Sequence, residues 1–219
     1  MRQEDIWDQE AAQAYDTPGT GMFAPDVLGP AVDRLAELAG DGRALEFAIG
    51  TGRIAVPLAE RDVSVTGIEQ SRPMIAQLRT KADETSIPVI PGDMAATRAP
   101  GVYTLVYLVY NAISCLLTQS EQVACFRNAA RHMAPGGRFV IELWVPELRR
   151  LPPGQQAIVW KSEPGYSPWT PTTCCTSTSS LTTSLAGFEL EARHADWAGT
   201  AFTAESQSHV SVYRLRGAS

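Results

Sequence analysis

Two acidic residues and two glycines near position 50 have the spacing of a nucleotide-type cofactor site. Glu46 lies in a short apolar run that Gly50 and Gly52 interrupt, and Glu69 ends a second apolar run. Glycines let the backbone approach a ligand closely, and the unpaired N–H groups at the start of a helix face the same crevice. A carboxylate at the tip of the next strand can accept hydrogen bonds from both ribose hydroxyls. The pattern therefore predicts a site for an adenosine-containing cofactor.

Two cofactors fit this pattern, and Glu46 distinguishes between them. Residues 50–55 satisfy the G-x-G-x-x-G/A fingerprint of dinucleotide-binding sites, which favours NAD. Glu46 precedes the glycines, where a carboxylate would repel the two phosphates of NAD and attract the α-amino group and the sulfonium of S-adenosylmethionine. Glu46 therefore favours S-adenosylmethionine, with NAD as the alternative.

The elements that must position these residues alternate between strands and helices. Apolar runs predict strands over 44–49, 63–68, 88–91, 103–110 and 138–144, followed by two closing strands over 188–197 and 209–214. Helical spacing predicts helices over 26–39, 54–60, 73–85 and 119–133, with the Pro-Gly-Gly sequence at 135–137 as the stop of the last one. This alternation predicts an α/β fold with a doubly wound, mostly parallel sheet.

Five sequence motifs occur in a fixed order along the chain. They read LEFAIGTGR at 45–53, VTGIEQS at 65–71, GDM at 92–94, LVYLVYNAISCLLTQSEQ at 105–122 and AARHMAPGGRFVIELWVPEL at 129–148. In this order they resemble the class I S-adenosylmethionine-dependent methyltransferases, and within them an actinobacterial group of small-molecule enzymes. FTAESQSHVSVYRL at 202–215 resembles the end of the same group. The resemblance implies a Rossmann-like fold with a seven-stranded sheet, in which the antiparallel C-terminal strand lies between its neighbours.

The resemblance also implies roles for individual residues. Glu46 would hold the methionine amino group, directly or through water, and Glu69 would bind the ribose. Asp93 would accept from the adenine amino group, Met94 would pack on the ring, and Tyr15 would fold over the cofactor. The complete set of expected cofactor-binding residues is Tyr15, Glu46, Ala48, Gly50, Gly52, Arg53, Glu69, Gln70, Asp93, Met94, Tyr110 and Asn111.

Several of these residues also have a purely structural interpretation. Glu46 and Glu69 can be solvated acids at strand ends, Asp93 and Asn111 are common turn residues, and Tyr15 can be a buried aromatic anchor. Asn111 follows a predicted strand, at the edge where open α/β sheets bind ligands, and the resemblance implies that it faces the sulfonium. The structure must decide which of these residues are brought together.

No residue is assigned a catalytic role from the sequence. A sulfonium is already a good leaving group, so alignment of the nucleophile matters most, and a general base is needed only for a protonated nucleophile. His132 is expected to end its helix near the dipole, and His194 and His209 lie in late strands. Glu142 and Trp144 end a strand, where they either line the acceptor pocket or pack within the sheet.

Composition narrows the function classes. The formal net charge of −6, without a basic run, argues against a nucleic-acid partner and leaves a small-molecule acceptor as the expectation. The polar first residues and the lack of a long apolar stretch predict a cytoplasmic protein with no membrane partner. The four cysteines, at 115, 125, 174 and 175, have neither metal-ligand nor disulfide spacing, so free thiols and no metal site are expected.

The resemblance stops between residues 164 and 185. Residues 167–180 form a Ser/Thr-rich, low-complexity run without apolar periodicity, which predicts neither a strand nor a stable helix. We therefore expect one domain with a cofactor-binding core over 1–150, an irregular acceptor-covering segment over 151–187 and closing strands over 188–219. One hypothesis is that 167–183 is translated out of frame; the alternative is a divergent loop. A chain altered here can bind the cofactor without efficient methyl transfer.

Overall fold

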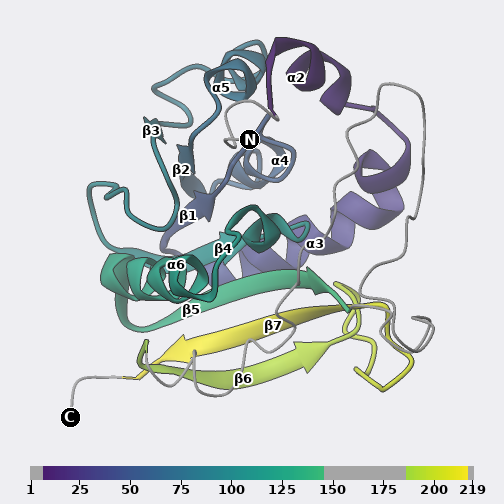
Figure 1. Cartoon of the computed structure of the whole chain (residues 1–219). Helices are drawn as coiled ribbons and strands as arrows, with labels where there is room; N and C mark the ends of the chain where they lie inside the picture. The colour runs from purple at the N-terminus through teal and green to yellow at the C-terminus, as the bar shows by residue number, and fades with distance from the viewer. Residues whose placement is uncertain (1–6, 146–185, 217–219) are drawn as a thin grey trace.

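The computed structural model describes residues 7–145 and 186–216, so the expected irregular segment over 151–187 lies almost entirely outside the described residues. Its centre is one seven-stranded sheet with the strand order β3-β2-β1-β4-β5-β7-β6 (Figure 1). The strands are β1 (Arg43–Phe47), β2 (Ser64–Glu69), β3 (Val89–Pro91), β4 (Tyr103–Leu108), β5 (Met133–Trp144), β6 (Phe188–His194) and β7 (Ser208–Leu215).

The pairing confirms the expected doubly wound sheet. Strands β1 to β5 pair parallel to one another, whereas β7 lies between β5 and β6 and pairs antiparallel with both. The sheet order runs in opposite directions from β1 and from β4, so the carboxyl ends of these two strands form a topological switch point. Ligands of open α/β sheets bind at this kind of switch point.

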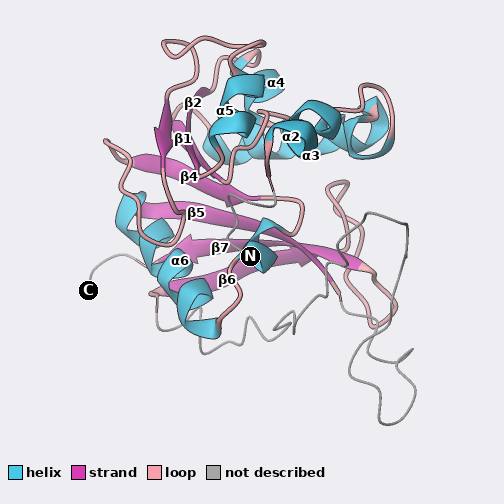
Figure 2. Ribbon diagram, turned by 45° about the horizontal axis from the view of Figure 1, so that its top comes forward, coloured by secondary structure: helices cyan, strands magenta, loops and turns pink. Residues whose placement is uncertain are grey.

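Helices cover both faces of the sheet (Figure 2). The α-helices are α2 (Gln9–Tyr15), α3 (Pro25–Ala39), α4 (Ala55–Ala59), α5 (Arg72–Leu78) and α6 (Gln119–His132), and the 3-10 helices are η1 (Gly21–Phe23) and η2 (Ala112–Cys115). One apolar core joins α3, α4 and α5 to the sheet through side chains such as Leu35, Leu58 and Leu78. The other core joins α6 to the opposite face, where Phe126 packs edge-on against Phe139 at 5.1 Å between ring centroids.

Local sequence explains where α6 and α5 begin. The Thr118 hydroxyl accepts from the Glu121 N–H, and the Glu121 carboxylate accepts from the Thr118 N–H, so α6 begins with a capping box. Ser71 caps α5 through the Met74 N–H, and Pro73 occupies the first turn, where no N–H partner is needed. The side-chain caps therefore fix the first residues of both helices.

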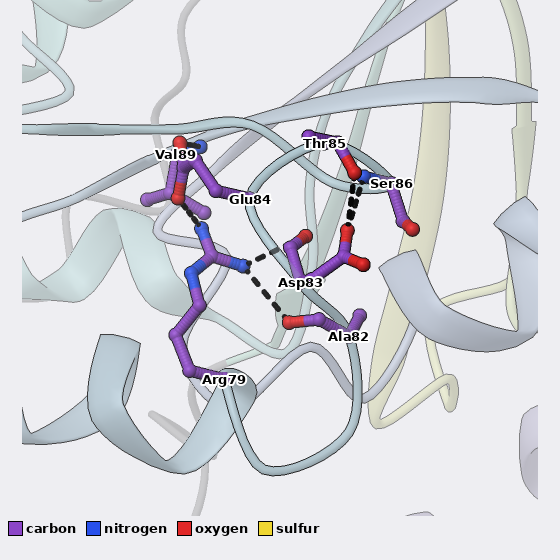
Figure 3. Close-up of polar contacts among 7 residues, drawn as sticks. All are labelled: Arg79, Ala82, Asp83, Glu84, Thr85, Ser86 and Val89. Atoms are coloured by element: carbon purple, nitrogen blue, oxygen red, sulfur yellow. Dashed lines mark hydrogen bonds and ion pairs between the residues drawn. The ribbon is translucent and has the colours of Figure 1, made fainter.

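The helix predicted over 73–85 ends at Leu78, and Figure 3 shows the reason. The Arg79 guanidinium donates to the backbone oxygens of Ala82 and Asp83 and pairs with Glu84. Asp83 accepts from the Thr85 hydroxyl and the Ser86 N–H, each at 2.7 Å. These side-chain bonds replace the backbone ladder of a helix, so the stretch forms a turn instead.

Several other predicted boundaries also differ. The strand predicted to reach Tyr110 ends at Leu108, because Tyr110 and Asn111 are left-handed, with φ values of +52° and +58°. Ala48 is also left-handed, so β1 ends at Phe47. The residues at 135–137 are not the turn that ends α6, because Met133 already pairs with Tyr103 and the stretch is an irregular part of β5. Helix α2 was not predicted.

The described part of the chain contains no helix that is both long and apolar enough to cross a membrane.

Candidate functional site

The loop after β1 has the backbone conformation of a ligand-binding turn. Ala48, Gly50 and Gly52 all have positive φ values, of 53°, 56° and 80°. The two glycines differ in what surrounds them. A Cβ on Gly50 would meet nothing closer than the Ala48 carbonyl oxygen at 3.9 Å, whereas a Cβ on Gly52 would lie 2.2 Å from Leu78 Cδ1. Gly50 therefore borders open space, and Gly52 is required for packing against α5.

Glu69 is a buried carboxylate that connects two loops, not a solvated surface acid. Its side chain accepts from the Gly50 N–H at 2.9 Å and from the Ser71 N–H at 2.7 Å. Only 8% of the residue is exposed. Burial raises the pKa of Glu69, and the bonds from Ser71 and Gly50 oppose this shift. The carboxylate lies directly beside the glycine loop, as the spacing predicts.

Glu46 is the second buried carboxylate, only 2% exposed. It accepts from the Tyr107 hydroxyl at 2.9 Å. Burial raises the pKa of Glu46 to about 8, the Tyr107 bond and the Arg53 charge lower it, and the Glu69 charge raises it further. A buried carboxyl with this pKa is stabilised in its charged form by any cation that enters beside it. The solvated alternative for Glu46 is therefore wrong.

Tyr107 was missed by the sequence analysis. It lies within the continuous apolar run of β4 and is completely buried. The available signal was a hydroxyl inside such a run, since a buried hydroxyl needs a hydrogen-bond partner. Its partner, Glu46, lies opposite it in the β1–β4 pair.

The residues before α3 lie across the glycine loop. The Asp16 carboxylate accepts from the Thr51 hydroxyl at 2.5 Å and pairs with Lys81 Nζ at 2.5 Å. The Ser71 hydroxyl donates to the Trp7 carbonyl oxygen at 2.7 Å, and the Arg53 guanidinium donates to the Met22 carbonyl oxygen at 3.1 Å. These contacts join the amino-terminal segment to the loops that follow β1 and β2.

Tyr15 lies in this segment, in a cluster of aromatic rings. Its ring packs edge-on against Trp7 at 5.3 Å and Phe23 at 6.2 Å between centroids. Burial raises the pKa of Tyr15 to about 12, while the charge of Arg53 lowers it. The structure thus packs the partly buried Tyr15 ring among aromatic side chains and places its hydroxyl within the electrostatic reach of Arg53.

Tyr110 and Asn111 form the turn after β4. The Tyr110 ring lies under the Arg53 guanidinium at 5.2 Å and edge-on to Trp144 at 5.5 Å. The Asn111 side-chain oxygen accepts from the Trp144 N–H at 3.3 Å, which also makes Asn111 a turn residue with a structural partner. Tyr110 is 39% exposed and Trp144 is 51% exposed, so both rings present apolar surface at the carboxyl edge of the sheet.

Asp93 and Met94 lie in the turn after β3. One Asp93 oxygen accepts from the Ala95 N–H at 2.8 Å, as expected for a turn residue, and Met94 is buried in the core on the α6 side. The side-chain amide of Asn128, on α6, donates to the Met94 and Thr97 carbonyl oxygens and holds the turn in place. Gln70 is exposed next to Glu69.

The histidines have structural environments. His132 is buried; its Nδ1 is paired with the Asn128 carbonyl oxygen, and its Nε2 accepts from the Ala99 N–H at 2.9 Å. His132 is the last residue of α6, as expected, but burial lowers its pKa, so the ring lies there as a buried, hydrogen-bonded core residue. His209 pairs with the Ser211 hydroxyl, and burial lowers its pKa to about 4.

Metal ligands and disulfides are not found in the part of the chain that the structure describes. No three His, Cys, Asp or Glu side chains there are grouped to hold a metal. Cys115 and Cys125 are not in disulfides, and Cys174 and Cys175 lie outside the described residues.

Comparison with known proteins identifies the family. A family model described as a methyltransferase domain matches residues 44–137. The structure of the CcbJ methyltransferase from Streptomyces caelestis is similar with a TM-score of 0.78 and 30% identity, over 94% of this chain and 96% of that one. This chain belongs to the class I S-adenosylmethionine-dependent methyltransferases. S-adenosylmethionine is the cofactor of this methyltransferase family, which decides against NAD.

Two further methyltransferases are similar over part of their length. One is the cypemycin N-terminal methyltransferase of a Streptomyces species, 26% identical over 67% of this chain. The other is the dTDP-3-amino-3,4,6-trideoxy-alpha-D-glucopyranose N,N-dimethyltransferase of Streptomyces venezuelae, 27% identical over 46% of this chain. The matches span 59% and 41% of these two relatives.

Proposed function

We propose that this methyltransferase transfers a methyl group from S-adenosylmethionine to a small-molecule acceptor, and that Glu46 and Glu69 hold the two polar ends of the cofactor. The observation that supports this most is the pair of buried carboxylates at the ends of β1 and β2, on either side of a left-handed glycine loop. A cation beside the buried Glu46 would stabilise its charged form, and Glu69 would accept from ribose hydroxyls through lone pairs that Gly50 and Ser71 leave free.

The bound cofactor supplies a methyl group on a sulfonium that is already a good leaving group. The residues of the chain then have three tasks. Glu46 and Glu69 fix the cofactor along the strand ends. Tyr15 and Arg53 cover the cofactor and exclude water from it. Tyr110 and Asn111 border the side from which an acceptor approaches. Asp93 and Met94, after β3, would hold the adenine. Alignment of this kind accounts for most of the rate of an in-line transfer.

We infer that the acceptor presents an amine. Both partial relatives have names that specify methylation at nitrogen, on an N-terminus and on an amino sugar. An unprotonated amine needs no general base, and the residues proposed to hold the cofactor include no histidine. The exposed rings of Tyr110 and Trp144 offer an apolar surface for the carbon skeleton of such an acceptor.

S-adenosylhomocysteine should bind and raise the melting temperature of the chain, because a ligand of the native state stabilises it by mass action. At 100 times the Kd the gain in unfolding free energy is about 2.7 kcal/mol. NAD at the same concentration should give no shift. Differential scanning fluorimetry with both ligands measures this, and a larger shift with NAD would refute the assignment.

The two loop glycines provide a matched pair of substitutions. Gly50→Ala adds a methyl group to open space beside Glu69, so it should weaken S-adenosylhomocysteine binding, and its cost in stability comes from the left-handed backbone alone. Gly52→Ala drives a Cβ into Leu78 and should lower stability by about 1–3 kcal/mol more than Gly50→Ala does, the usual cost of overpacking. Chemical denaturation and calorimetric binding measure the two effects. Equal stability losses would contradict the different environments of the two positions.

Turnover tests whether the chain is an enzyme or a cofactor-binding protein without efficient transfer. We expect methylation of at least one member of a panel of amines and amino sugars, with phenols as the comparison class. Cofactor binding without turnover on any member would support a cofactor-binding protein without efficient transfer. The hypothesis that residues 167–183 are translated out of frame would explain such a loss. That stretch lies outside the described residues.

A further inference from the structure

The turn after β4 has a conformation that its own residues disfavour. Tyr110 and Asn111 are left-handed one after the other, with φ values of +52° and +58°. A left-handed backbone brings the Cβ of a bulky residue too close to the following carbonyl oxygen, so tyrosine rarely adopts it, whereas asparagine tolerates it better. Contacts from elsewhere in the fold must therefore hold Tyr110.

The backbone N–H groups of both turn residues are bonded to a single residue of β5. One carboxylate oxygen of Glu142 accepts from the Tyr110 N–H at 2.7 Å, and the Glu142 backbone carbonyl accepts from the Asn111 N–H at 3.1 Å. The second carboxylate oxygen accepts from the indole N–H of Trp197 at 2.9 Å. Trp197 lies in the connection between β6 and β7, more than fifty residues away in the chain.

Both carboxylate oxygens of Glu142 thus have N–H donors. These two bonds give Glu142 a structural role in the fold, which is the packing alternative of the sequence analysis. The turn that Glu142 holds connects to the glycine loop through Tyr110 and to the end of β5 through Asn111. The Tyr110 ring contacts Arg53, and the Asn111 side chain is bonded to Trp144.

We propose that Glu142 is a positioning residue, whose carboxylate fixes Tyr110 and Asn111 at the methyl-donor side of the cofactor and joins this turn to the β6–β7 connection through Trp197. The proposal rests on the proposed function, because it takes the turn to face the transferred methyl group. Glu142 itself touches neither the cofactor nor the acceptor, and it acts through the backbone of Tyr110.

The test uses the two N–H donors, from Tyr110 and Trp197, that face the Glu142 carboxylate. Glu142→Gln keeps the shape but replaces one acceptor oxygen by an NH₂ donor, so either the Tyr110 N–H or the Trp197 indole N–H faces another donor. In Glu142→Gln/Trp197→Phe the indole donor is gone, and the amide oxygen can turn toward Tyr110. The double variant should therefore recover what the single variant loses. Glu189→Gln, the same change at an exposed position of β6, is the control.

Two cofactor analogues separate local from general damage. Sinefungin carries an amine-bearing carbon in place of the sulfonium, so its affinity reports on the surroundings of the transferred methyl group. S-adenosylhomocysteine has a thioether sulfur at this place and neither a methyl group nor an amine on it. In Glu142→Gln we expect the Kd of sinefungin to rise about tenfold and that of S-adenosylhomocysteine by less than about threefold, as for one lost bond beside a charged group. In the double variant the sinefungin Kd should return to within about threefold of the Trp197→Phe value.

Equal losses for both analogues, or no recovery in the double variant, would overturn the positioning role. The melting temperatures of the free proteins keep this outcome separate from a failure of the proposed function. If the wild-type chain bound neither analogue, the proposed function would fail. The two Glu142 bonds, to the Tyr110 N–H and the Trp197 indole N–H, would still predict a lower melting temperature for Glu142→Gln. The double variant should then recover at least half of that loss.

Discussion

Glu69→Ala should weaken the binding of S-adenosylhomocysteine by about 1–3 kcal/mol, which is about 5- to 150-fold in Kd. The expected reason is that ribose hydroxyls lose a charged acceptor while they remain buried. The same substitution leaves the Gly50 and Ser71 N–H groups without their acceptor, so the melting temperature should fall as well. Binding is therefore measured by calorimetry well below the transition, where the variant is folded.

Two controls give the Glu69 result its meaning. Glu60→Ala removes an exposed carboxylate near the end of α4 and should change neither Kd nor stability appreciably. Asp93→Ala tests the proposed adenine contact independently. Unchanged binding in Glu69→Ala together with lost binding in Asp93→Ala would show that the ribose has another partner and that the role of the β2 carboxylate is mistaken.

Cofactor binding should release a proton from Glu46. The pKa of Glu46 is about 8 in the free protein, so near neutral pH the carboxyl is largely protonated, and a ligand ammonium group beside it favours the charged form. Between pH 6 and 7.5, where an α-amino group with a pKa of about 8 stays protonated, the Kd of S-adenosylhomocysteine should fall about tenfold per pH unit. Glu46→Gln has no proton to lose, so its Kd should hardly depend on pH.

Calorimetry in buffers of different ionisation enthalpy measures the proton directly. About one proton should leave per S-adenosylhomocysteine bound to the wild-type chain at pH 7, and none from Glu46→Gln. The stability of the free protein gives a second check. Since the folded pKa lies above the unfolded value of 4.5, the contribution of Glu46 to stability is complete below that value and is lost as the pH rises through about 8. Proton release that persisted in Glu46→Gln would place the titrating group elsewhere.

The sequence was sufficient to predict the sheet and the positions of the glycine loop and the two acidic residues beside it. Strand periodicity and the breaks at Gly50 and Gly52 depend on residues close together in the chain, and the structure places Glu46 and Glu69 on both sides of that loop. Helix α2 escaped prediction because its seven residues have no apolar stripe. What holds the segment after it is the pairing of Asp16 with Thr51 and Lys81, which are distant in sequence.

The remaining errors have the same physical origin. The helix over 73–85 was predicted too long because its pattern does not show that Arg79 bonds to the carbonyl oxygens ahead of it. The partner of Tyr107 depends on the register of β1 against β4, and the partners of Glu142 depend on a turn and a late connection. Periodicity in one dimension predicts elements, whereas such contacts exist only after the elements have packed.

The antiparallel strand β7 sets the order in which this half of the molecule can assemble. In the described part of the chain β6 pairs with β7 alone, although β6 is made first. During synthesis β6 therefore has no place in the sheet until the chain has been extended through Leu215 and β7 has paired with β5. Until then Phe188 lacks the Tyr213 ring beside it in the folded core. Strands β1 to β5 can assemble before β7 has been made, because they pair with one another.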